Sequence, residues 1–393
     1  MFTFVNMNYS GTLQPVMESY ASIRENAIEG RYLHLDHIQP LLKKHSENFR
    51  IKEIGRSVLD KPIHRVEIGN GKIKVLAWSQ MHGNESTTTK AVFDLLNAAC
   101  LLKDDSVMTT VLSNCTIRII PMLNPDGAQA YTRVNANQVD LNRDARDLKE
   151  PESRLLRGEF DEFKPDFCFN LHDQRTIFSA GKARKPATLS FLTPAMDTTR
   201  AILPERKKSM QIIAGIYADL KETLPGSIGR YDDSYNINCT GDTFQTAKVP
   251  TILFEAGHAP GDYKREKVRE YVYAAMLSGL YAIASGKFAK INYLAYTNIP
   301  QNEKLFNDII LRNVLINNQR MDVSIQYKEE LEGEIIKLVP IIEKIAPEIT
   351  TFAHRKIDGK GKNIEFPEAS EVGENVIVNK IVLNGEIIGL NCE

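Results

Sequence analysis

The sequence predicts an α/β fold, in which helices flank a β-sheet, followed by a small β-rich C-terminal domain. Up to about residue 291, short apolar runs typical of strands alternate with amphipathic segments typical of helices. One run, KVLAWSQ at 74–80, is almost continuously apolar, as expected of a strand inside a sheet that is covered on both faces. From about residue 292 the sequence pattern changes to alternating or clustered apolar and charged residues. We therefore expect two domains, residues 1–291 and 292–393.

The first third of the chain contains a predicted helix, then strands, then a second helix. Apolar spacing predicts a helix over 34–49 and two or three strands over 53–80. The sequences DKP at 60–62 and GNG at 69–71 supply the turns between these strands. A helix over 86–102 follows, with an apolar stripe along one side.

The same alternation of strands and helices continues to the end of the larger domain. The expected elements are a strand (115–123), a loop to about residue 150, a helix (151–163), a strand (167–172), a helix (201–224), a strand (249–257) and a helix (262–286). In the C-terminal domain, strand-like pieces surround turns at 359–363 and 384–385. Its one histidine, His354, has no neighbours that would form a catalytic cluster.

The charge balance excludes two classes of partner. The chain has 393 residues, 49 of them basic and 50 acidic, and a formal net charge of −1. Such a balance has no electrostatic footprint for nucleic acid or for an anionic membrane surface. Hydrophobic residues make up 42% and charged residues 25%, which is the composition of a globular protein and excludes a disordered chain.

Cysteine usage and the apolar runs predict a cytoplasmic protein. The five cysteines are odd in number and widely spaced, at Cys100, Cys115, Cys168, Cys239 and Cys392. This pattern excludes a disulfide framework and a cysteine zinc cage, and it suits a reducing compartment. The N-terminus shows no secretory signal. The longest apolar run, 271–284, is too short for a membrane-spanning helix, which needs about 20 residues, so we expect a buried helix there.

Polar side chains follow several predicted strands, at the sheet edge where α/β proteins bind ligands. His82 and Glu85 lie between a buried strand and a helix, and their HxxE spacing lets both side chains reach one ion. His172 ends another apolar strand. Two histidines and one carboxylate, with a fourth position left for water, form a common catalytic zinc site. An isolated HxxE pattern is weak support, because a lone histidine is more often a surface or core residue.

Two further features add to this hypothesis. The loop after NPDG (124–127) contains two arginines, Arg133 and Arg143, and several amides that could fix a substrate carboxylate, although a solvated polar loop is an equal alternative. Glu255 ends the apolar strand TILFEAG, where a carboxylate must be paired, protonated or functional. Beside a zinc-bound water it could act as general base.

Together these segments resemble the zinc carboxypeptidase family, whose best-known members are carboxypeptidases A and B. The motifs HGNE, NPDG and RVNANQVDLNR, followed by the strand-ending His172 and Glu255, have the family's order and context. The resemblance covers about residues 30–290. It implies a mixed, roughly eight-stranded twisted sheet flanked by helices, and one Zn²⁺ per chain.

The resemblance also implies roles for individual residues. His82, Glu85 and His172 match the zinc ligands, and Asp140 matches the carboxylate that receives the other ring N–H of His82. Glu255 matches the catalytic glutamate.

On the substrate side, Arg133 resembles the arginine that stabilises the oxyanion, while Asn142 and Arg143 match the pair that holds the terminal carboxylate. The family's tyrosine corresponds to Tyr231 or Tyr235, of which we favour Tyr231.

Three residues leave the substrate class open. Asp173 stands where the family commonly has a small hydroxyl residue, and FEAGH replaces the usual continuation after the glutamate. His258 within that segment is either structural or part of the cleft. Asp242 could select a cationic side chain or could only cap a turn.

The predicted function is a zinc-dependent metallocarboxypeptidase, a hydrolase that cleaves C-terminal peptide bonds with zinc-bound water and a glutamate general base. A first alternative is an amidohydrolase or deacylase that acts on N-acyl amino acids or cell-wall peptides. A second alternative is a metal-free binding module, which we disfavour because no ligand position is lost. The expected partner is a peptide or N-acyl amino acid, and the sequence assigns no oligomeric state.

Overall fold

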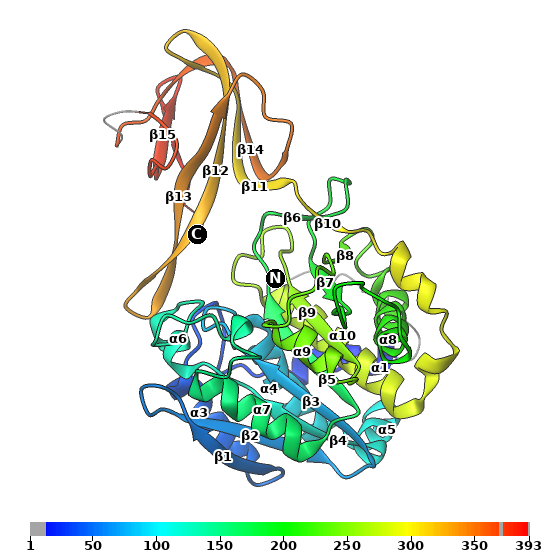
Figure 1. The fold of residues 1–393 in the computed structure, drawn as a ribbon. Coiled ribbons are helices and arrows are strands. Elements are labelled where there is room, and N and C mark those ends of the chain that lie inside the picture. Colours follow the sequence, from blue (N-terminus) through cyan, green and yellow to red (C-terminus); the bar gives the residue numbers. More distant parts are fainter. Residues whose placement is uncertain (1–12, 369–371, 392–393) are drawn as a thin grey trace.

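A computed structural model describes residues 13–368 and 372–391 of the chain (Figure 1). Within these residues, the larger domain is built on an eight-stranded mixed sheet with the order β1-β2-β4-β3-β5-β9-β7-β8. Its strands are β1 (Arg50–Arg56), β2 (Pro62–Gly69), β3 (Ile73–Ser79), β4 (Cys115–Ile120), β5 (Phe167–Asp173), β7 (Leu189–Leu192), β8 (Ile228–Arg230) and β9 (Thr251–Ala256). The central strands β4, β3, β5 and β9 are parallel. The predicted α/β sheet is confirmed.

Helices cover both faces of this sheet (Figure 1). Those of the described residues are α1 (Gln14–Glu18), α2 (Tyr20–Ile23), α3 (Leu35–His45), α4 (Thr87–Leu101), α5 (Ser106–Asn114), α6 (Pro125–Ala130), α7 (Pro151–Phe163), α8 (Pro204–Leu220), α9 (Thr240–Thr246) and α10 (Glu266–Ser285), with 3-10 turns at Leu141–Arg143, Lys287–Lys290 and Tyr293–Asn298. One core contains α4, α8 and α10, and a smaller core contains α7 and α9. The run at 271–284 lies inside α10 and is buried, as predicted.

The run KVLAWSQ shows why the central strands are apolar on both sides. Val75 and Ala77 belong to the larger core, while Leu76 and Trp78 belong to the smaller one on the opposite face. Since side chains alternate between faces along a strand, a strand covered on both faces must be apolar throughout.

Helix α4, which follows the HGNE segment, is tied to α10 by buried ion pairs. Lys90 Nζ lies 2.5 Å from a carboxylate oxygen of Glu266, and Arg269 lies 2.6 Å from Asp94. Buried charges require such partners. Helix α4 is therefore attached to α10 through these side chains.

The C-terminal part of the chain forms a second sheet with the order β13-β12-β11-β14-β15-β16. Its strands are β11 (Phe306–Ile316), β12 (Gln319–Glu332), β13 (Ile335–Ala346), β14 (Phe352–Glu365), β15 (Lys380–Leu383) and β16 (Glu386–Gly389). Before it, β10 (Asn302–Lys304) pairs with β6 (Phe178–Ala180) of the larger domain. The β-rich C-terminal sheet is confirmed, whereas the boundary at residue 291 stays a prediction.

The structure differs from the expected elements in several places, and the short helices α1, α2 and α9 are among the elements that were not predicted. Helix α5 occupies 106–114, for which no element was predicted, and strands β6, β7 and β8 lie in a region expected to contain only a helix. NPDG was read as a turn within a loop, but it starts α6, where the Asn124 side chain accepts a hydrogen bond from Gly127 N at 2.8 Å. Short strands and one-turn helices carry too few residues to show a period.

None of the helices among the described residues is long and apolar enough to cross a membrane. The four cysteines that are described, Cys100, Cys115, Cys168 and Cys239, are free thiols. Cys392 and the first twelve residues, on which the expected absence of a signal rested, lie outside the described residues.

Candidate metal centre and active site

Three predicted metal ligands meet at the carboxyl ends of β3 and β5. The His82 and Glu85 side chains come from the segment between β3 and α4, and His172 comes from β5; all three are buried. One ligand atom from each lies within 4.8 Å of the other two. The order of the strands therefore brings together residues that are 87 positions apart in sequence.

Glycines allow this segment to pack closely. A Cβ atom on Gly83 would come within 1.9 Å of the Gly127 backbone, so no larger residue fits there. Gly127 in turn lies against the side chain of Asn124. The HGNE and NPDG segments therefore pack directly against each other. The side-chain amide of Gln80 also donates a hydrogen bond to the carbonyl of Gly83 at 2.8 Å.

The donor atoms face one another at close range. His82 Nδ1 lies 2.8 Å from Glu85 Oε1, His172 Nδ1 lies 2.9 Å from Glu85 Oε2, and the two Nδ1 atoms are 3.2 Å apart. Two imidazole lone pairs so close repel each other unless a proton or a cation lies between them. Two nitrogens and a carboxylate are a usual donor set for catalytic zinc, so the residues fit that ion.

Asp140 links His82 to Arg133. Asp140 Oδ1 is 3.0 Å from His82 Nε2, which leaves Nδ1 of the same ring for the metal. Arg133 Nε donates to Asp140 Oδ2 at 3.0 Å, and Arg133 Nη1 lies 3.3 Å from Glu85 Oε1. Burial acts to raise the pKa of Glu85, but His82 and His172 more than offset it and hold the pKa well below its usual range. Glu85 is thus an anion ready to bind a cation.

Glu255 lies beside the metal ligands because β9 pairs with β5. The register places Glu255 opposite His172. Its Oε2 atom is buried and has no hydrogen-bond partner among the described residues. Burial, followed by the nearby carboxylates of Glu85 and Asp173, raises the pKa of Glu255 well above its usual range. A carboxyl group with a pKa raised in this way is typical of residues that transfer protons.

Asn142 and Arg143 lie where the 3-10 turn meets the start of α9. Asn142 Oδ1 accepts a hydrogen bond from Thr240 N at 2.9 Å. Arg143 is exposed, donates to the Asn142 carbonyl at 2.6 Å and contacts Cys239 Sγ at 3.1 Å. Within the described part of the chain, it forms no ion pair with Asp140 or Asp144, so its charge remains open to a substrate.

Of the two tyrosines considered, Tyr231 lies nearer the metal ligands. Burial, then the charges of Glu255 and Glu85, raises the pKa of Tyr231. The Tyr235 hydroxyl instead faces Thr246 at 3.4 Å, next to α9.

The other flagged residues have structural partners or lie off the metal site. Asp173 accepts hydrogen bonds from the backbone N–H and the hydroxyl of Thr87, at 3.1 and 2.6 Å, at the start of α4. Asp242 accepts from Ala195 N at 3.0 Å, and burial raises its pKa to about 7. His258 is buried between the rings of Tyr263 and His354. Burial lowers the pKa of His258 well below its usual range, which keeps the ring neutral.

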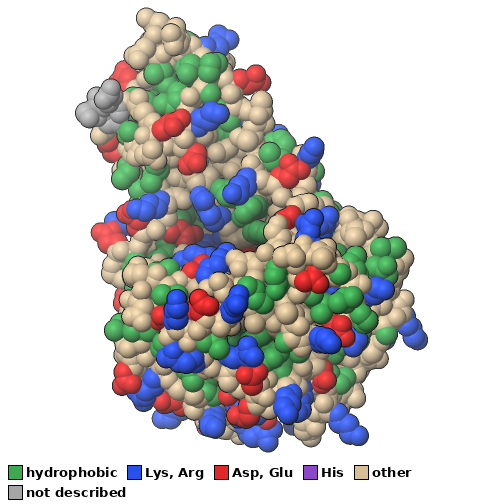
Figure 2. All heavy atoms as spheres, in the orientation of Figure 1, with side chains coloured by type: hydrophobic (Ala, Val, Ile, Leu, Met, Phe, Trp, Pro, Cys, Tyr) green, Lys and Arg blue, Asp and Glu red, His purple; other side chains and the backbone are tan. Residues whose placement is uncertain are grey.

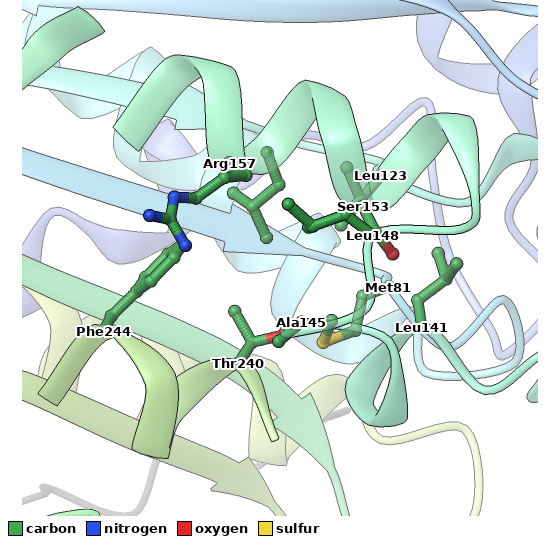
Figure 3. A pocket seen from close by; sticks show the side chains of 10 residues that line it. Met81, Leu123, Leu141, Ala145, Leu148, Ser153, Arg157, Thr240 and Phe244 are labelled. Atoms are coloured by element: carbon green, nitrogen blue, oxygen red, sulfur yellow. The ribbon is translucent and has the colours of Figure 1, made fainter. Parts of the chain in front are cut away.

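Two pockets flank these residues. The first, between α7 and α9, is lined mainly by apolar side chains such as Leu141 and Phe244, with Arg157 at its rim (Figure 3). Its volume of about 10 Å³ leaves room for little more than one water molecule, so we regard it as a packing gap.

The second pocket is a cavity of about 490 Å³ between the metal ligands and the C-terminal sheet. Glu85 and Arg133 line it together with Tyr327, Glu329 and other residues of the second sheet. The sequence pattern predicted no functional residues in that sheet. Its alternating residues at 324–345 are those of any half-exposed strand, and nothing local indicates where they point.

Comparison with known proteins agrees with these observations. Residues 34–172 match the family model described as zinc carboxypeptidase. Carboxypeptidase SOL1 of Arabidopsis thaliana is 31% identical over 131 residues, which are 29% of this chain and 27% of that protein. Carboxypeptidase 2 of Trichophyton equinum is 25% identical over 173 residues, 42% of this chain and 30% of that one. The chain therefore aligns with less than a third of the length of these relatives.

Solved structures share the fold at low sequence identity. Carboxypeptidase A from Helicoverpa armigera has a TM-score of 0.52 and 15% identity, with 71% of this chain and 82% of that chain covered. A metallo-carboxypeptidase from Burkholderia cenocepacia has a TM-score of 0.51 and 19% identity, with 64% and 69% covered. The resemblance to the zinc carboxypeptidase family is thus confirmed, by sequence over residues 34–172 and by fold over about two thirds of the chain.

Proposed function

We propose that this chain is a zinc-dependent metallocarboxypeptidase that hydrolyses the C-terminal peptide bond of its substrate. The observation that carries the proposal is the meeting of three metal donors with Glu255, whose buried Oε2 lacks a partner among the described residues. A structural carboxylate in that place would be paired. When bound by His82, Glu85 and His172, zinc would supply a Lewis acid and an activated water.

The chain's own residues then divide the remaining work. Glu255 accepts a proton from the attacking water and passes it to the leaving amine, since it lies opposite His172 and its Oε2 has no partner among the described residues. Arg133 offers its guanidinium to the developing oxyanion, and Asp140 holds both Arg133 and His82 in position. At the other end of the substrate, the exposed guanidinium of Arg143, which has no carboxylate partner among the described residues, would bind the terminal carboxylate.

Asn142 would share this carboxylate with Arg143, since it lies on the same turn. Tyr231 would close over the bound residue. The substrate would be a peptide, with no role for nucleic acid or membrane. A cytoplasmic location belongs to the same proposal and rests on the free cysteines.

A second candidate is hydrolysis of a cell-wall peptide or an N-acyl amino acid. One observation favours it: gamma-D-glutamyl-L-diamino acid endopeptidase 1 of Lysinibacillus sphaericus is 34% identical over 80 residues, 19% of this chain and 20% of that protein. The short aligned length makes this the weaker candidate.

One assay separates these candidates. The protein would be loaded with zinc and tested on peptides with free and amidated C-termini, on N-acyl amino acids, and on γ-glutamyl peptides, each with and without a chelator. A carboxypeptidase should release the last residue only from free C-termini, and the chelator should abolish release. Cleavage of only the acyl or γ-glutamyl substrates would favour the second candidate. Failure to cleave any substrate would contradict both.

A further inference from the structure

The C-terminal sheet faces the metal ligands across the cavity. Its longest hairpin, β12–β13, extends from the second sheet toward α6 of the larger domain (Figure 1). In the middle of β12, Gln326 donates to Thr176 Oγ1 at 2.8 Å, and in the neighbouring strand β11 Asp308 accepts from Tyr263 at 2.9 Å. The second sheet is therefore attached to the larger domain close to β5.

The end of the hairpin near its turn is also attached to the larger domain. Glu329 forms an ion pair with Arg31 at 2.9 Å and accepts a hydrogen bond from the Tyr131 hydroxyl at 2.5 Å. Burial acts to raise the pKa of Glu329, but Arg31 and Arg265 more than offset it and lower the pKa. Beyond it, Glu334 lies 3.5 Å from His34 Nε2. Separating a partly buried ion pair is costly because it leaves a buried charge without its partner.

The 490 Å³ cavity lies between these two attachments. Figure 2 shows charged side chains gathered along the hollow between the C-terminal sheet and the larger body. Glu85 and Arg133 line the cavity, but Asn142, Arg143 and Tyr231 do not. The cavity therefore borders the metal ligands without including the proposed carboxylate pair, which leaves it available for the part of the substrate that precedes the bond to be cleaved.

We propose that the β12–β13 hairpin sets the length of the substrate, so that the enzyme takes short, polar peptides and rejects the C-terminal tails of proteins. This inference rests on the proposed function. A cavity of this volume holds a group the size of a drug molecule, and an extended chain advances by about 3.3 Å per residue, so a few residues fill it. In this proposal the hairpin, which is attached through Gln326 and Glu329, forms the wall that a longer chain would meet. Its charged lining favours polar substrates.

A length series tests the proposal. Peptides with the same last three residues, from an N-acetylated tripeptide to a dodecamer, would be assayed with the zinc-loaded, full-length protein. We expect kcat/KM to be at least tenfold lower for the dodecamer than for the best short peptide. Equal values across the series would overturn the inference while leaving the proposed function intact. Absence of cleavage at every length would overturn both.

Shortening the hairpin should remove the length limit. Lys328 and Val339 face each other in the strand register, so an Asn-Gly turn can join them in place of residues 329–338. The ratio of kcat/KM for the dodecamer to that for the tripeptide should then rise at least tenfold, with the short peptide still cleaved. An unchanged ratio would overturn the inference.

Point variants give a second test if the shortened protein does not fold. Glu329→Gln removes the charge that pairs with Arg31 and should raise the same ratio at least threefold. Glu330→Gln is the matched control, because Glu330 is the next residue, is exposed and pairs with Lys328 on the surface. Circular dichroism would verify that both variants fold. Equal ratios in the two variants would contradict the role of the hairpin.

Discussion

The role of Glu255 can be tested by replacing it with glutamine, which has the same shape but cannot accept a proton. Loss of a general base costs about 10²–10⁴-fold in rate, which corresponds to about 3–5 kcal/mol of transition-state stabilisation. We therefore expect Glu255→Gln to keep zinc and bind substrate while kcat falls by about that factor. Steady-state kinetics and metal analysis on the same preparation measure both quantities.

The same substitution also tests the role of Glu255 through stability. Replacing a carboxylate that stabilises the fold would lower the melting temperature, but replacing Glu255 should not. Oε2 of Glu255 is buried and lacks a partner among the described residues, and burial raises the pKa of the group. Replacing a carboxyl group that the fold disfavours as an anion with a neutral amide removes no favourable ion pair. The melting temperature of Glu255→Gln should therefore equal or exceed that of the wild type.

Glu266→Gln is the matched control, because Glu266 is also a largely buried carboxylate but is remote in role from the metal. It binds Lys90 at 2.5 Å and Arg24 at 2.8 Å, and its side chain is 22% exposed. Burial acts to raise its pKa, but Lys90 and Arg269 lower it from 4.5 to about 2, which corresponds to about 3 kcal/mol of stability. This variant should lose stability and keep kcat. If Glu255→Gln instead behaved like Glu266→Gln, the general-base assignment would be wrong.

Three further outcomes are expected. His82→Ala and His172→Ala should each abolish stoichiometric zinc in metal analysis, and zinc retained by either variant would contradict the ligand set. Arg143→Ala should lower kcat/KM at least tenfold for peptides with a free C-terminus and little for amidated ones, with Arg143→Lys only partly restoring it; an equal loss for both would rule out carboxylate binding. The stability from Glu266 is fully present above about pH 4.5 and is lost as the pH falls towards about 2, because its folded pKa is depressed. The difference in unfolding free energy between wild type and Glu266→Gln in urea should therefore shrink from about 3 kcal/mol at pH 7 towards zero at pH 2, whereas a constant difference would contradict the ionic origin.

The sequence predicts those parts of the fold that have a strong local pattern. The run at 74–80 and the helix at 151–163 are recognisable because their apolar residues follow the period of a strand or a helix. Strands β7 and β8, of four and three residues, are too short to show a period. Strand β7 forms because β9 offers it an edge, and β8 in turn pairs with β7, so both depend on the assembled sheet.

The same distinction applies to the candidate site. Motif order identified His82 and Glu85, since both lie in one short segment. That Glu255 stands opposite His172 depends on the pairing of β5 with β9, which no local pattern encodes. The contribution of Glu329 to the cavity depends on the reach of a hairpin from another sheet, and the sequence around it is that of an ordinary exposed strand.

Residues 31–33 contact both the β12–β13 hairpin and the segment that carries His82 and Glu85. Gln80 Nε2 donates to the carbonyl of Leu33 at 2.7 Å, and the Ser86 hydroxyl donates to the carbonyl of Arg31 at 2.6 Å. Gln80 and Ser86 flank the HGNE motif in the sequence, and the Arg31 side chain pairs with Glu329 of the hairpin. The Arg31 side chain is only 9% exposed, so without Glu329 it would be a buried cation without its principal counter-charge. The C-terminal hairpin therefore contacts the segment that packs beside the HGNE motif, which places one wall of the cavity next to the metal centre.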